Sequence, residues 1–215
     1  HTGPTVVNIT GQEYPVFYNP KSRLFTRIAL EEASQVSPLA PQGHYCVLWN
    51  PSVDDKHPSE RDKQVAPDLR IGERVNIPGP CTFSLWPQQS AQVIPGHHLR
   101  SNQYLLVRIY DEEQAKQNWT SAVIKPAQPT TGASEEVVDT GEPRVELTGE
   151  VPEDLSVGRQ IVIRGDQVSF YIPPTGVEVV PDVDGLFVRD ALTLERLEYA
   201  ILIDEDGNKR YERGP

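Results

Sequence analysis

The stretch that decides the fold runs from residue 160 to residue 180 and reads QIVIRGDQVSFYIPPTGVEVV. It contains three short runs of β-branched and aromatic residues, which are the residue types favoured in strands. Gly165-Asp166 separates the first two runs, and residues 173–176, Pro-Pro-Thr-Gly, separate the last two. Glycine, proline and aspartate at such points are typical of turns. The stretch therefore predicts strands over 160–163, 168–172 and 177–180.

Runs of the same composition lie on either side of this stretch, over 45–49, 104–110 and 199–203. The last run is followed by Asp206-Gly207, and Asp-Gly tolerates the positive φ angles of tight hairpin turns, so we expect 199–203 to pair with 209–211. Polar, helix-tolerant residues over 28–36 and 111–119 leave room for two short helices. The predicted fold class is mainly β, made of tandem small antiparallel β-sheet modules with little helix.

Composition limits the classes of function open to the chain. Its 215 residues include 31 acidic and 20 basic side chains, which give a net charge of −11. Such an acidic chain lacks the electrostatic footprint of a non-specific nucleic-acid binder, so we expect no nucleic-acid partner. The sequence contains neither an apolar run of the ~18 residues that a membrane helix needs nor a signal segment at its start. We therefore expect no membrane partner and no evident secretion.

Charge and turn residues divide the chain into three parts. Residues 1–124 are expected to form one or more β modules, with an inserted polar loop near 51–70. Residues 125–142 combine prolines, glycines and small polar or acidic residues, a composition that buries too little apolar area to offset the entropy of ordering, so they are predicted to be a linker or long loop. Residues 143–215 are predicted to be a further β module. The chain lacks methionine and starts at His1, so we expect a piece of a longer protein, with this last module truncated at its C-terminal end.

A comparison of the chain with itself indicates repetition. The heptad over 24–30, LFTRIAL, returns over 186–192 as LFVRDAL, with five of seven positions identical. A strand-like run follows each heptad, and a Gly-Pro pair follows each run. Several features in the same order favour a repeated unit of roughly 50–60 residues. A few short strands leave edges and an apolar face exposed, so neighbouring units or neighbouring chains must cover them.

The sequence offers few residues for chemistry. Motifs for nucleophilic, phosphate-binding or zinc-hydrolase chemistry are absent, so we predict no enzyme activity, no catalytic residue and no cofactor. The run Asp54-Asp55-Lys56-His57 could touch a metal, but its lysine favours a solvated loop, and no metal site is predicted. Cys46 and Cys81 are expected to be buried free thiols, and a bridge between them stays open. Trp49 and Trp86 are the candidate binding aromatics if the protein recognises a ligand such as a sugar.

At this point the residues resemble a known family. Residues 164–180, followed by GLFVRD over 185–190, resemble the repeat of the major vault protein, in which an aromatic-Ile-Pro step precedes a Val-Glu-Val-Val strand and a Gly-aromatic-Val segment. The segment GHYCVLWNP over 43–51 resembles another part of that repeat. The resemblance covers about half of the chain. The loop around 56–67, the acidic linker and the lack of a long helical cap depart from the family pattern, and a tandem β-repeat protein of a bacterial virus particle would read similarly.

The resemblance implies small antiparallel β domains in tandem, laid beside copies from other chains in the wall of a hollow particle. Together with the repetition, it leads us to expect a non-enzymatic structural protein. Its partners would be copies of itself in a homo-oligomeric shell, tube or virion component, with other shell or virion proteins as further partners. The alternative is a binding module for viral attachment or carbohydrate recognition, which would use Trp49 or Trp86.

Overall fold

The computed structural model describes residues 11–19, 21–34, 36–58, 67–127, 151–152, 154–203 and 207–214. Short strands joined by turns make up most of this part of the chain, with one α-helix and two 3-10 turns. The elements in chain order are β1 Val16–Asn19, β2 Leu24–Arg27, η1 Leu30–Glu32, β3 Leu39–Ala40, β4 His44–Trp49, β5 Arg74–Pro78, β6 Cys81–Thr82, β7 Ser90–Pro95, β8 His97–His98, β9 Gln103–Ile109, α1 Glu112–Asn118, η2 Trp119–Ser121, β10 Val123–Pro126, β11 Gln160–Arg164, β12 Val168–Ile172, β13 Val177–Val179, β14 Val188–Asp190, β15 Tyr199–Ile203 and β16 Lys209–Arg213.

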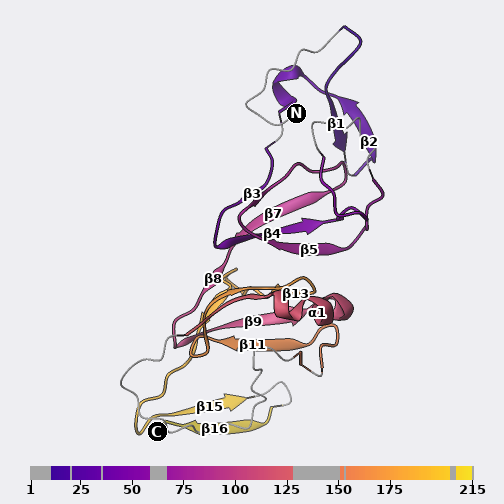
Figure 1. Cartoon of the computed structure of the whole chain (residues 1–215). Helices are drawn as coiled ribbons and strands as arrows, with labels where there is room; N and C mark the ends of the chain where they lie inside the picture. Colours follow the sequence, from indigo (N-terminus) through magenta and orange to yellow (C-terminus); the bar gives the residue numbers. More distant parts are fainter. Residues whose placement is uncertain are drawn as a thin grey trace.

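The strands form small antiparallel sheets that follow one another along an elongated molecule (Figure 1). The β1–β2 hairpin lies at one end and the β15–β16 hairpin at the other. Between them lie a sheet of order β5-β4-β7 and a sheet of order β11-β9-β13, with β14 also paired to β9. The structure confirms the predicted mainly β class with small antiparallel sheets and little helix, whereas the tandem arrangement of modules stays a prediction. All six predicted strands are present within one or two residues of their expected bounds.

Two clusters of buried side chains hold the central sheets together. The larger cluster surrounds β9, whose alternating residues Leu105, Val107 and Ile109 are fully buried, as the two-residue period of a strand requires. Trp119 from η2 and strands β11 to β13 complete it. The smaller cluster joins Tyr45 and Val47 of β4 to Phe170 and Ile172 of β12, so it packs the β5-β4-β7 sheet against a further three-stranded sheet of order β10-β12-β8.

The helix expected within 111–119 is present as α1, whose N-cap Asp111 accepts a hydrogen bond from the Gln114 N–H. The segment 28–36 contains only the 3-10 turn η1. The β15–β16 pairing was expected, and residues 204–206 of its turn lie outside the described residues.

Hydrogen bonding between strands cuts across the predicted boundary at residues 125–142. β9 pairs with β11 and β13, and β10 pairs with β12, so residues from both sides of that segment share sheets. β10 itself extends to Pro126, and residues 128–142 lie outside the described part of the chain. The division into modules stays a prediction, because composition reports local chain preference and carries no information on which distant strands bond.

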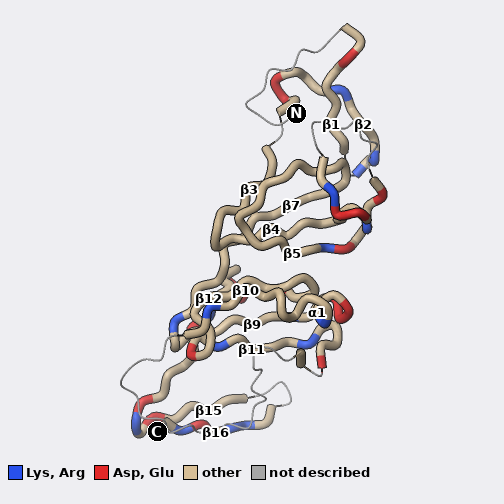
Figure 2. The backbone as a smooth tube through the Cα atoms, in the orientation of Figure 1, with Lys and Arg blue, Asp and Glu red and all other residues tan. Residues whose placement is uncertain are grey.

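Charged residues lie in loops and on several strands, most densely on β16, whereas β4 and β7 carry none (Figure 2). The two matching heptads occupy different places: Leu24–Arg27 pairs with β1, and Val188–Asp190 pairs with β9. A repeated unit therefore stays a prediction as far as these heptads are concerned.

Candidate functional site

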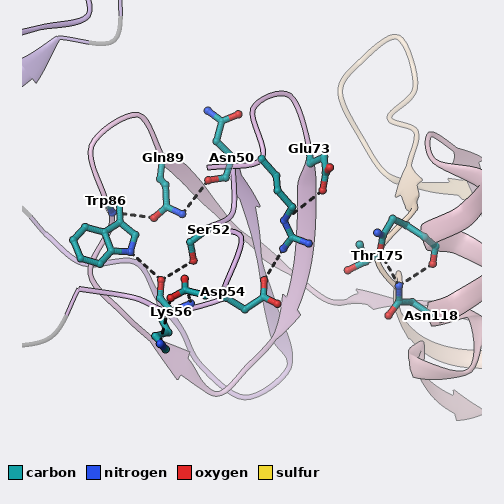
Figure 3. Close-up of polar contacts among 12 residues, drawn as sticks. Asn50, Ser52, Asp54, Lys56, Glu73, Trp86, Gln89, Asn118 and Thr175 are labelled. Carbon is teal, nitrogen blue, oxygen red and sulfur yellow. Dashed lines mark hydrogen bonds and ion pairs between the residues drawn. The ribbon is translucent and has the colours of Figure 1, made fainter. Parts of the chain in front are cut away.

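Trp86, one of the two candidate aromatics, is buried and anchors a loop. Its side chain is 8% exposed, and its indole Nε1–H donates to the Lys56 carbonyl oxygen at 2.9 Å (Figure 3). The Ser52 hydroxyl donates to the same oxygen at 2.8 Å. Gln89 links this loop to β4, because its side chain accepts from the Trp86 N–H and donates to the Asn50 carbonyl. Trp86 thus holds residues 52–56 in place, at the start of the loop predicted near 51–70.

Trp49, the other candidate aromatic, is half-buried at the end of β4. It lines a cavity of about 180 Å³ between the first central sheet and the β13 side of the second. Other lining side chains include Asn76, Gln92 and Tyr110. The structure thus places Trp49 and Trp86 apart in role, one beside an inter-sheet cavity and the other under a loop.

An ionic network joins the β5-β4-β7 sheet to the β11-β9-β13 sheet beside this cavity, and we call this contact region the junction. Arg74 on β5 bonds Glu178 on β13 at 2.6 Å, and Arg108 on β9 bonds the other oxygen of that carboxylate at 2.6 Å. The Glu178 side chain is only 23% exposed, so the two guanidinium groups compensate much of the lost hydration of the carboxylate. One carboxylate therefore ties two strands of one sheet to the edge strand of another.

The Arg74 guanidinium also stacks on the Tyr110 ring at 3.7 Å from its centroid, a cation–π contact. The Tyr110 hydroxyl donates to the Arg74 carbonyl and accepts from the Gly176 N–H at 3.0 Å. Burial raises the pKa of Tyr110, and the bond from Gly176 and the charge of Arg74 partly oppose this shift. The phenol therefore stays protonated and acts as a fixed hydrogen-bonding group.

Asn76 follows Arg74 by two residues on β5 and so lies on the same face of the strand. Its Nδ2 group donates to the carbonyls of Pro174 at 2.9 Å, Val177 at 3.0 Å and Pro173 at 3.3 Å. Its backbone N–H donates to the Thr175 hydroxyl oxygen at 3.0 Å. One side chain thus donates to three carbonyl groups of the 173–177 turn. The turn in return lies along the edge of β5 and covers it.

His97 is a buried titratable group at the same junction. It is 4% exposed, its ring packs edge-on against Tyr45 and Phe187, and its Nε2 lies 3.3 Å from the Tyr45 hydroxyl. Burial lowers the pKa of His97 to about 4, with a smaller contribution from the neighbouring His98. The imidazole is therefore neutral at physiological pH and packs as part of the core.

The remaining reactive groups are held in separate contacts. Cys46 and Cys81 are both free thiols, and burial raises the pKa of Cys46 to about 11, so it is a poor nucleophile. Asp54 pairs with Lys56, Asp55 pairs with Arg70, and His57 stacks on Phe83. Within the described ranges, no cluster of three or more histidine, cysteine or acidic side chains is arranged to hold a metal ion.

The arrangement joins two sheets through ion pairs, a stacked guanidinium and an asparagine that caps a turn. Sequence reasoning missed Arg74, Asn76, Tyr110 and Glu178, because an arginine or asparagine within a strand gives no motif. One signal exists: at an offset of 86, glycines and prolines coincide at 72 and 158, 79 and 165, 87 and 173, and 95 and 181. The matched positions enclose β5, which carries Arg74 and Asn76, and β13, which carries Glu178.

Comparison with known proteins adds no assignment. The chain matches no model of a protein family, and no curated protein sequence is significantly similar to it. The resemblance to the major vault protein repeat therefore stays a prediction. In the part of the chain that the structure describes, none of the helices has the length and apolar character needed to cross a membrane.

Proposed function

We propose that the protein is a non-enzymatic structural component whose β modules pack side by side in a homo-oligomeric shell or tube, as a cytoplasmic particle or part of a virion. The observation that carries this proposal is the exposed apolar surface of the two end hairpins. In β1–β2, Phe17, Leu24 and Phe25 are 42–63% exposed, and in β15–β16, Tyr199 and Ile203 are 63–64% exposed. An isolated two-stranded hairpin is marginally stable in water, so these hairpins gain stability from neighbours that cover them.

The two central sheets are built alike, which supports the proposal that the chain consists of similar modules. In each, the middle strand is flanked by two strands that come later in the chain, in the orders β5-β4-β7 and β11-β9-β13. A short strand before each middle strand pairs with a later strand in both cases, as β3 with β6 and β8 with β12. Ordered, similar modules joined by a bonded junction make a rod that can lie beside copies of itself.

Sedimentation and electron microscopy of the protein test the proposal. We expect large regular particles, strengthened by salt because screening reduces repulsion between chains of charge −11. Phe25→Asp on β2 should abolish them, whereas the matched control Val183→Asp, at a fully exposed valine outside the hairpins, should not. A strictly monomeric wild type under all salt conditions would refute the assembly proposal.

A binding module is the second candidate, favoured by one observation: half-buried Trp49 beside Arg74 and Gln92 at the junction cavity. Aromatic rings with adjacent polar groups suit sugar recognition. A glycan array tests this candidate. Reproducible hits lost with Trp49→Ala but kept with Trp86→Phe would support it, and a blank array would reject it.

A further inference from the structure

Three strand pairs in the molecule begin in the same way. A turn precedes the first strand of each pair, and the residue at the end of that turn donates its N–H to the carbonyl three residues earlier. These bonds are His44 to Pro41 at 3.0 Å before β4, Gln103 to Arg100 at 2.9 Å before β9, and Glu198 to Glu195 at 3.0 Å before β15. The third pair, β15–β16, therefore opens like the two central sheets.

The three pairs also end in the same way, at a glycine after the second strand. The N–H groups of Gly79, Gly165 and Gly214 donate to the carbonyls of His44, Gln103 and Glu198 at 2.8, 2.8 and 2.9 Å. A Cβ atom at any of the three would collide with the carbonyl oxygen of Pro41, Arg100 or Glu195, so each position requires glycine for close approach. The shared geometry makes β15–β16 the equivalent of β4–β5 and β9–β11.

The pairs differ in what lies on the other edge of the first strand. β7 occupies that edge of β4, and β13 together with β14 occupies that edge of β9. Among the described residues, β15 pairs with β16 alone. The side chains reflect this difference: Leu48 and Val107 are 2% and 0% exposed, whereas Leu202 at the equivalent position of β15 is 40% exposed.

In the part of the chain that the structure describes, no strand lies at the position beside β15 that corresponds to β7 and β13. Down the molecule in Figure 1 the strands run β7, β4, β5, then β13, β9, β11, then β15 and β16. A strand between β11 and β15 would continue this order. Val162 at the centre of β11, which the offset of 86 places at the position of Asn76, is 47% exposed, whereas Asn76 is covered by the 173–177 turn.

We propose that the free edge of β15 is an acceptor site for one antiparallel strand of the β7 and β13 type. The two strands that fill this position define its chemistry: Ala91-Gln92-Val93-Ile94-Pro95 and Val177-Glu178-Val179-Val180-Pro181. The partner is thus a short extended segment with aliphatic residues at alternate positions and a closing proline. Backbone bonds along the edge supply affinity, and the alternate aliphatic side chains cover Leu202, as in β-strand addition. This inference differs from the shell proposal, which uses the face of β15 that carries Tyr199 and Ile203, because it concerns the edge of β15 and the opposite face with Leu202.

Hydrogen exchange on a tethered strand tests the proposal. A copy of residues 167–181 is appended directly after Pro215, which reproduces the spacing between Gly165 and Val177 and holds the strand at a local concentration on the order of millimolar. The matched control carries aspartate in place of both valines equivalent to Val177 and Val179. At dilute, monomeric protein, we expect exchange at the β15 amides not bonded to β16 to slow at least about tenfold relative to the control. The amides of the β1–β2 hairpin should not change.

Equal exchange in the two extended chains, with the rest of the fold intact, would overturn the proposal. So would protection of β15 in the unextended chain that increases with protein concentration, because a second copy would then be the occupant. As a second measurement, a free peptide with the sequence of residues 174–182 is titrated into the unextended chain. Protection confined to β15 and absent with the doubly aspartate-substituted peptide supports the proposal.

Discussion

Replacing Asn76 with alanine should lower the free energy of unfolding by about 2 kcal/mol. The side-chain Nδ2 makes two good hydrogen bonds, to the carbonyls of Pro174 and Val177, and a longer one to Pro173. Each good hydrogen bond contributes about 1 kcal/mol net, and the carbonyls of the buried residues Pro174 and Val177 do not fully regain water when the amide is removed. The Asn76→Ala variant therefore loses the cover of the 173–177 turn together with its bonds.

Asn76→Asp separates the hydrogen bonds from the shape of the side chain. Aspartate has nearly the same size, but at neutral pH it has no donor and directs a charged oxygen at the carbonyls. We expect it to be less stable than Asn76→Ala by about 1 kcal/mol, because a charge without a donor is costly to bury.

Urea denaturation followed by tryptophan fluorescence measures these changes, since Trp49 and Trp119 lie on the two sides of the junction. The matched control is Gln92→Ala, an exposed amide beside the same cavity, which should stay within about 0.5 kcal/mol of the parent. An Asn76→Ala variant as stable as this control, or an Asn76→Asp variant as stable as the parent, would refute the reasoning.

Three further predictions concern His97, Glu178 and Trp86. His97 has a folded pKa of about 4, below the ordinary value of 6.5, so the unfolded chain binds the proton first; stability should fall by up to about 3 kcal/mol as pH drops from 6.5 to 4. Denaturation at several pH values should show this slope reduced in His97→Phe and kept in the exposed control His98→Gln, and an unchanged slope in His97→Phe contradicts the assignment. Glu178→Gln should cost about 1 kcal/mol in dilute buffer and less in 1 M salt, since the carboxylate bridges Arg74 and Arg108; a difference that salt does not alter counts against an ionic junction. Trp86→Phe should cost about 1 kcal/mol and speed trypsin cleavage after Lys56 but not after Lys116 in α1, and equal cleavage rates at Lys56 in variant and parent would show that the indole bond does not hold the loop.

The sequence was a good guide to strands whose composition is strongly β-like. β4, β9, β11, β12 and β15 are rich in valine, isoleucine, leucine and aromatic residues, and their expected bounds are nearly correct. β5 was missed because Asn76 and Pro78 break its pattern, and β7 because Ser90 and Gln92 dilute it. Both are held by pairing to β4, so tertiary contacts decide their conformation.

The junction could not be predicted for a related reason. Arg74 and Glu178 are far apart in the sequence, and each alone is an ordinary surface residue of a strand. Their meeting depends on the pairing of β13 with β9 and on the packing of β12 against β4, neither of which leaves a local signal. The candidate aromatics show the same limit, since composition identifies Trp86 but not the Lys56 carbonyl that engages its indole.

The central place of β9 has a consequence during synthesis. β9 ends at Ile109 and its partner β13 ends at Val179, so 179 − 109 = 70 residues must leave the ribosome before that edge is covered. At translation rates of about 5–20 residues per second, this interval lasts roughly 4–14 s. For that time Val107 and Ile109 lack the cover of β13, which makes the nascent chain a natural client for a chaperone that binds extended apolar segments.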